Sequence, residues 1–217
     1  MKKGLFVFAL LISQNLNATG YFEGTFGGLK SVDRTYNNPQ QPEVNTLPLW
    51  YVYGFNLGMV YKNADLSFGY TNYDTPSVNT SYEGLLPGDF SLTIYDLQAL
   101  VILPVTKKMD IKLGGSLGYA EIQHKIADEI TEQYQKMIQG STIKITEVLD
   151  NQIIETFSGG LGYKISKHFE ISIIAKYLLL NTVRTRKILQ SNAWIYQETD
   201  RINLNSLFGV LGIRVYF

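Results

Sequence analysis

The chain has 217 residues with 19 basic and 19 acidic side chains, and it contains no cysteine. The lack of cysteine excludes a disulfide framework and thiolate chemistry, and the balanced charge lacks the clustered basic surface that nucleic acid requires. Fifteen tyrosines, eleven phenylalanines and nineteen glycines favour a β-sheet with one lipid-facing side.

Residues 1–18 are expected to be a secretory signal peptide. Lys2 and Lys3 give it a charged start, a short apolar stretch follows, and Ala18 offers a small residue for cleavage. The apolar stretch is shorter than the ~20 residues that a membrane-spanning helix needs. Removing 18 of 217 residues leaves 199, with 17 basic and 19 acidic side chains. Residues 19–217 therefore fit one domain.

Alternation with a period of two recurs along this domain and predicts eight strands. The clearest run is 51–61, where large apolar side chains alternate with small or polar ones, as in a β-strand with one apolar face. In 92–103 the polar face also carries Ile94, Leu100 and Ile102. The eight expected strands are 21–30, 51–61, 66–71, 92–103, 111–119, 157–165, 171–179 and 206–217.

The connections between these strands alternate in length. Those near 62–64, 104–109 and 166–168 are short, whereas those near 31–48, 74–90, 123–151 and 182–200 are long. Short turns on one rim and long loops on the other are typical of outer-membrane barrels. We therefore predict an all-β fold: an eight-stranded antiparallel up-and-down transmembrane β-barrel with short periplasmic turns and long extracellular loops.

Outward-facing aromatic residues are expected to form a belt at each membrane interface. The ten steps from Tyr51 to Tyr61, at ~3.3 Å each and tilted about 40°, span roughly 25 Å of the membrane normal. The expected interface residues are Tyr51, Tyr53, Tyr70, Tyr95, Tyr119 and Tyr177 toward the long loops, and Tyr61 and Tyr163 toward the short turns.

The final strand has the sequence Leu211-Gly-Ile213-Arg-Val215-Tyr-Phe217. With it, nearly all of 19–217 resembles the small outer-membrane barrels of the OmpA and OmpX type. The resemblance implies an outer-membrane location in a Gram-negative cell and contact with outer-membrane lipid and lipopolysaccharide. It also implies that the barrel-assembly machinery reads Phe217 as an assembly signal. A soluble lipocalin-like barrel is the alternative, but glycines, serines and charges alone would then have to form its surface.

Seven charged residues fall on the predicted inward face: Glu23, Asp96, Lys112, Lys164, Glu170, Lys176 and Arg214. Three acids and four bases nearly balance, and an eight-stranded barrel has room only for its own side chains or one small ligand. We predict a buried ion-pair network that fills the lumen. The alternative is a narrow polar channel for small polar solutes, whose network opens.

Catalysis is not expected. Small-barrel enzymes, chiefly those that modify lipid A, would need a histidine base beside a serine near one rim. The only two histidines are His124, expected at the base of a long loop, and His168, expected in a short turn. Two isolated histidines form no metal cluster, so no metal or cofactor is expected.

The long loops are the expected place of recognition. Apolar residues at every fourth position predict an amphipathic helix near 126–138. The alternatives are a flexible loop or, because 141–148 also alternates, a hairpin extension. Arg184, Arg186 and Lys187 could meet lipopolysaccharide phosphates or form a solvated basic face. The sequence thus predicts a non-enzymatic barrel that presents four long surface loops, with a structural or adhesive role and an unidentified surface ligand.

Overall fold

The computed structural model describes residues 18–31, 50–74, 85–137, 142–191 and 193–217. The predicted signal peptide up to residue 17 and most of the first two long connections lie outside the described residues.

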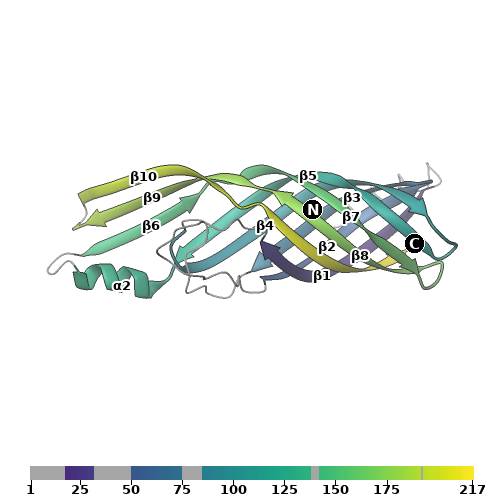
Figure 1. The fold of residues 1–217 in the computed structure, drawn as a ribbon, viewed down its shortest axis with the longest axis horizontal. Coiled ribbons are helices and arrows are strands. Elements are labelled where there is room, and N and C mark those ends of the chain that lie inside the picture. The colour runs from purple at the N-terminus through teal and green to yellow at the C-terminus, as the bar shows by residue number, and fades with distance from the viewer. Residues whose placement is uncertain (1–17, 32–49, 75–84, 138–141, 192) are drawn as a thin grey trace, which may run out of the picture.

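Eight antiparallel strands close into a barrel, in the order β1-β11-β8-β7-β5-β4-β3-β2 (Figure 1). Each strand pairs with the two strands beside it in this order. The barrel closes where Tyr21–Ser31 of the first strand, β1, pair with the last strand, β11. The predicted eight-stranded up-and-down barrel is confirmed. Its strands are β1 (Thr19–Ser31), β2 (Trp50–Tyr61), β3 (Ala64–Asp74), β4 (Gly88–Pro104), β5 (Met109–Ile126), β7 (Gln152–Lys164), β8 (Phe169–Leu179) and β11 (Ser206–Tyr216).

Three short turns lie at one rim of the barrel, as predicted. They cover residues 62–63, 105–108 and 165–168. Strands β4 and β5 are longer than expected and continue past the barrel wall at the opposite, long-connection rim. Because β5 continues to Ile126, the third long connection begins beyond the rim of the barrel.

The outward face of the barrel is an apolar belt of exposed side chains, such as Leu97, Phe26 and Ile173. The belt ends where Tyr95 of β4 pairs with Tyr119 of β5. Beyond this pair the outward partners are polar: Thr93 with Glu121, Ser91 with Gln123, and Asp89 with Lys125. An apolar band flanked by aromatic residues fits the hydrocarbon core of a membrane, so β4 and β5 project beyond it.

A second, three-stranded sheet continues the barrel at the long-connection rim, and we call it, together with α2 (Asp128–Met137), the extension (Figure 1). Its strands are β10 (Ala193–Asn203), β9 (Asn181–Gln190) and β6 (Ile143–Leu149). Strand β8 passes into β9 through Leu180, and β10 passes into β11 through residues 204–205. The extension therefore prolongs the barrel wall itself.

The extension corrects one prediction and combines two others. Residues 182–200 were expected to be a long loop, but they form the β9–β10 hairpin. The predicted helix near 126–138 is confirmed by α2, and the alternating segment 141–148 also forms a strand, β6. Within the described residues, no helix is long and apolar enough to cross a membrane.

The lumen has two halves of different chemistry. Most of the buried charges lie in the half near the short turns. The half near the long connections is mainly apolar, with Lys176 of β8 among its side chains, and its apolar cluster continues into the extension. In this apolar half the rings of Tyr73 and Phe208 meet edge to face, with centroids 5.2 Å apart. Other members of the cluster are Val52, Leu92, Ile94, Ile154, Ile174, Leu178 and Val210.

Candidate functional site

Arg214 of β11 is the centre of the charged half of the lumen. Its Nη1 lies 2.7 Å from Asp65 Oδ2, and its Nη2 lies 3.0 Å from Glu23 Oε2. The guanidinium carbon also lies 3.7 Å from the centroid of the Tyr21 ring, and Tyr21 donates a hydrogen bond of 2.6 Å to Asp65. Charge, hydrogen bonds and a cation–π contact therefore stabilise this fully buried cation.

The carboxylate of Glu23 extends this cluster around the barrel. It accepts a hydrogen bond of 3.1 Å from Asn56 on β2 and one of 2.8 Å from Ser172 on β8. A second buried pair, Lys112 with Glu170, lies beside it, and Tyr216 donates a hydrogen bond of 2.6 Å to Glu170. Six of the eight barrel strands thus contribute to one polar layer.

Inward-facing glycines make room for these side chains. A Cβ atom at Gly212 would collide with Glu23 and Ser172, and one at Gly162 would collide with Asp110. The glycines therefore let the charged groups approach the barrel wall closely.

Six of the seven charges predicted to face inward are buried: Glu23, Asp96, Lys112, Glu170, Lys176 and Arg214. Lys164 departs from the expectation because it lies at the short-turn rim with its side chain 46% exposed, 3.6 Å from Asp110. Neither Asp96 nor Lys176 takes part in an ion pair with another described residue. The polar layer therefore occupies part of the lumen rather than all of it.

Within the barrel lumen, sequence reasoning missed two buried acids, Asp65 and Asp110. Both lie next to short turns, where the strands were expected to have ended. Their parity was the available signal, because Asp65 falls on the same face as Ser67 and Asp110 on the same face as Lys112.

All eight predicted interface tyrosines lie on strands with outward-facing parity, and six are exposed by more than a third: Tyr51, Tyr53, Tyr61, Tyr95, Tyr119 and Tyr163. Tyr70 and Tyr177 are half-buried, Tyr70 because its ring packs between Phe55 and Tyr95. Near the long-connection rim, Tyr53 donates to Asp74 and accepts from Asn72. Phe217, the expected assembly signal, donates its backbone N–H to the carbonyl of Gly20 at the opposite rim.

Glu147 of β6 is the centre of a second buried polar cluster, which joins the extension to the barrel strands. Its Oε1 accepts a hydrogen bond of 2.7 Å from Nε of Arg186 on β9 and forms an ion pair of 2.6 Å with Nη2 of the same residue. Its Oε2 accepts one of 3.0 Å from the backbone N–H of Leu86 and lies 3.1 Å from Nδ1 of His124 on β5. One carboxylate therefore contacts parts of the second, third and fourth long connections.

The surroundings of Glu147 keep it ionised. Burial alone raises the pKa of its carboxyl, but hydrogen bonds from His124, the Leu86 backbone and Arg186 hold this pKa below its ordinary value of 4.5. Since its side chain is fully buried, the negative charge depends on these partners.

The predictions for Arg184 and Arg186 need correction, whereas His124 lies near the end of β5, at the base of the third long connection as expected. Arg184 binds Asp200 through two hydrogen bonds, of 2.8 and 2.5 Å, and its side chain is only 5% exposed. Arg186 lies between Glu147 and Glu198, and His124 is 2% exposed. Both arginines lie inside the contact between the extension and the barrel strands, which we call the joint, because opposite charges on β6 and β10 lie directly across from them. His124 of β5 contacts the Glu147 carboxylate in the same joint. Lys187 alternates to the opposite face of β9.

The other chemical candidates are dispersed. His168 lies exposed in the 165–168 turn, where its backbone N–H donates to the Ser166 hydroxyl. Among the described residues, no group of three or more histidine and acidic side chains is placed to hold a metal ion. The arrangement is suited to fixing the fold and the extension.

Comparison with solved structures identifies the same fold. The outer membrane protein OprG from Pseudomonas aeruginosa is 13% identical, with a TM-score of 0.62 and coverage of 92% of this chain and 96% of that chain. Neisserial surface protein A is 11% identical, with a TM-score of 0.57 and coverage of 92% and 97%. A major outer membrane protein from Thermus thermophilus is 8% identical, with a TM-score of 0.51 and coverage of 92% and 99%.

No protein-family model and no curated protein matches the chain. At these low identities the structural likeness establishes the fold alone: the chain has the fold of small eight-stranded outer-membrane β-barrel proteins.

Proposed function

We propose that this protein is a non-enzymatic outer-membrane barrel that holds a rigid extension outside the cell for structural or adhesive contacts. The observation that carries the proposal is the continuity of β8 with β9 and of β10 with β11. Because the extension prolongs two barrel strands and is locked by the Glu147 cluster, the barrel fixes its orientation. OprG, an outer membrane protein that shares the fold, supports an outer-membrane location. Short turns in the periplasm are the usual arrangement of such barrels.

The test removes the extension while keeping the barrel. Replacing residues 182–203 by a two-residue turn deletes the β9–β10 hairpin and leaves β8 and β11 whole. Fluorescent proteoliposomes carrying each form are applied to arrays of immobilised extracellular-matrix proteins and glycans. The full chain is expected to bind at least one array element, and the shortened form to give background signal. Equal binding by both forms across the array would contradict an adhesive role.

A narrow channel for small polar solutes is the second candidate. The charged half of the lumen favours it, because a ring of ionised side chains could guide polar solutes. The apolar half opposes it, since a polar solute would have to pass Tyr73, Phe208 and their neighbours.

A lipid A-modifying enzyme is the third and weakest candidate. His124, the histidine nearest the long-connection rim, faces the carboxylate of Glu147 in a buried cluster of charges. The hydrogen bonds and ion pairs of this cluster, within the described residues, bring no serine hydroxyl against it.

A further inference from the structure

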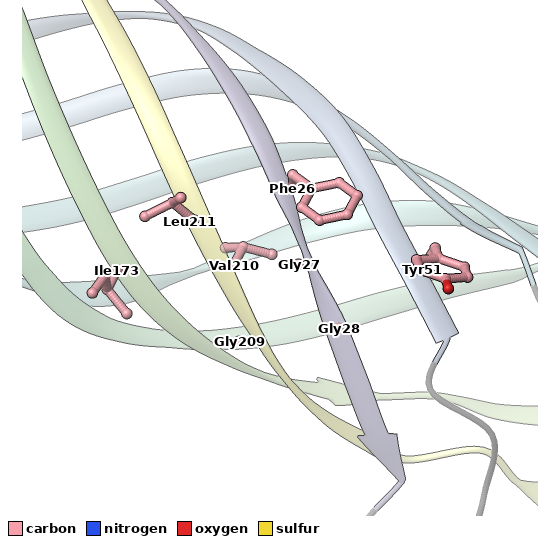
Figure 2. A pocket seen from close by; sticks show the side chains of 8 residues that line it. All are labelled: Phe26, Gly27, Gly28, Tyr51, Ile173, Gly209, Val210 and Leu211. Atoms are coloured by element: carbon pink, nitrogen blue, oxygen red, sulfur yellow. The ribbon is translucent and has the colours of Figure 1, made fainter.

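A hollow of about 440 Å³ lies on the outer wall of the barrel, across the seam between β1 and β11 (Figure 2). The hollow is shallow and open to the membrane rather than enclosed. Phe26, Tyr51, Ile173 and Leu211 surround it with their outward-facing side chains, and Gly27, Gly28, Gly209 and Val210 complete its lining.

The hollow exists because three outward positions in one cross-strand row are small. Gly28 of β1 pairs with Gly209 of β11, and Gly209 pairs with Ala175 of β8. On one side of this row stand Phe26, Leu211 and Ile173, which are also cross-strand partners; on the other stand Leu207 and Tyr177. Because this row lacks large side chains, a slot about 6–7 Å wide lies between the two neighbouring rows of large side chains, which form ridges on either side of it.

Packing inside the barrel does not require a glycine at position 209. A Cβ atom built there meets no other atom within 4 Å, and its backbone is not in the left-handed region. A side chain would therefore extend into the hollow. By contrast, a Cβ atom at Gly159, the next position along the row, would lie 3.3 Å from Leu113, which closes the slot.

The slot begins at one aromatic belt and runs toward the middle of the membrane. Gly28 at its upper end pairs with the belt residue Tyr51, whose outward side chain borders the hollow. Gly159 at its closed end pairs with Leu113, which lies three outward positions from Tyr119 toward the short turns. The row crosses strands that are tilted by about 40°, so it descends from the interface into the hydrocarbon.

We infer that this slot binds one acyl chain of lipopolysaccharide. The hollow is continuous with the lipid-facing belt, so hydrocarbon covers it, and its end beside Tyr51 lies near the long-connection rim. The choice of lipopolysaccharide rests on the proposed orientation, which places that rim in the outer leaflet. A bound chain loses conformational freedom, but the slot is preformed, which lowers the cost of binding.

The shape of the slot disfavours a second copy of the chain as its occupant. Two convex barrel walls touch along a narrow line, and the exposed ridges formed by Phe26, Leu211 and Ile173 would meet first. The floor at Gly209 would then stay uncovered, whereas a single polymethylene chain is narrow enough to reach it.

The experiment compares Gly209→Leu, which fills the slot, with Gly24→Leu as a matched control. Gly24 also lies on the lipid-facing side of the seam, outside the slot, and a Cβ atom there likewise meets nothing within 4 Å. Each full-length form is refolded with equal amounts of lipopolysaccharide and phosphatidylethanolamine, and lipid retained after detergent washing is counted by native mass spectrometry. A heat-dependent shift in gel migration verifies that each barrel is folded.

Wild type and Gly24→Leu are expected to retain one lipopolysaccharide, and Gly209→Leu about tenfold less. Equal retention by all three forms would overturn the inference. Slot-dependent retention of phosphatidylethanolamine instead, or dimers that only Gly209→Leu abolishes, would overturn the choice of occupant. The orientation is measured separately by cysteine labelling, so its failure would be distinguishable from failure of the slot.

Discussion

Glu23 and Arg214 are directly opposite each other across the seam between the first and last strands, and their side chains form an ion pair of 3.0 Å inside the barrel. The same guanidinium reaches Asp65 on β3. Residues separated by almost the whole domain therefore close the barrel from within, at the level where it has no apolar core.

Arg214→Met should strongly destabilise the barrel. It leaves the carboxylates of Glu23 and Asp65 buried without a cation, and breaking a buried pair in this way costs about 3–5 kcal/mol. Urea unfolding of the refolded protein, followed by gel migration, measures the change. Lys167→Met is the control, because this lysine is exposed in the 165–168 turn and a surface substitution of this kind changes stability by no more than about 0.5 kcal/mol. Similar midpoints for the two variants would contradict the assigned role of Arg214.

The purified, refolded barrel should give no conductance steps in planar lipid bilayers. The apolar half of the lumen around Tyr73 and Phe208 presents a dry barrier to ions, whatever the state of the charged half. Regular steps from wild type that change in size in an Arg214→Met protein would contradict this expectation and favour the channel.

Glu147→Gln should loosen the extension while the barrel stays folded. The change removes the charge that His124 and Arg186 face, at a cost of about 3 kcal/mol. Trypsin should then cleave after Arg184 and Arg186, whose side chains are 5% and 18% exposed in the native joint. Glu198→Gln is the matched control, since this carboxylate is already 37% exposed and contributes less. Equal protection in both variants would show that Glu147 does not hold the joint.

The same protection should depend on pH below 4.5 only. Because the folded-state pKa of Glu147 lies below its ordinary value of 4.5, its stabilisation is complete above that pH. It is lost as pH falls through the lower folded-state value. His124, Arg184, Arg186, Glu198 and Asp200 also face this region, so an acid-stable protease is used to compare wild type with Glu147→Gln. A loss of protection that is identical in both would exclude Glu147 as its cause.

Lipid A extracted from cells with and without the protein should give the same mass spectrum. Among the described residues, the ionic partner of His124 is the carboxylate of Glu147 rather than a nucleophile, so no acyl chain is expected to be removed or transferred. A new lipid A species that disappears in His124→Phe would contradict the non-enzymatic proposal.

The barrel could be predicted from sequence because a strand with one lipid-facing side alternates apolar residues with small or polar ones. Runs such as Tyr51–Tyr61 alternate strictly, since one face meets hydrocarbon and the other the lumen. The sequence of the β9–β10 hairpin lacks this alternation. Its strands stand beyond the apolar belt, and charges such as Arg184 and Asp200 form its buried face, so in sequence they resemble solvated loop residues.

The candidate site could be predicted only where charge broke an apolar pattern. Arg214 lies between the apolar residues Ile213 and Val215, and this position predicts that its side chain faces inward. Asp65 and Asp110 were not predicted to face the lumen, because turns and strand ends are both polar and the strand boundary between them is not visible in the sequence. The Glu147 cluster could not be predicted for a different reason. Its members come from three connections far apart in sequence, and no local sequence pattern indicates which charges form contacts.

The most direct test of the central claim is the side of the membrane on which the extension lies. The chain has no cysteine, so Lys144→Cys on β6 and Lys107→Cys in a short turn each provide a single label site. Intact cells are treated with a membrane-impermeant maleimide. The proposed orientation predicts labelling at position 144 in intact cells and at position 107 only after permeabilisation. Labelling at position 107 but not at 144 in intact cells would contradict it.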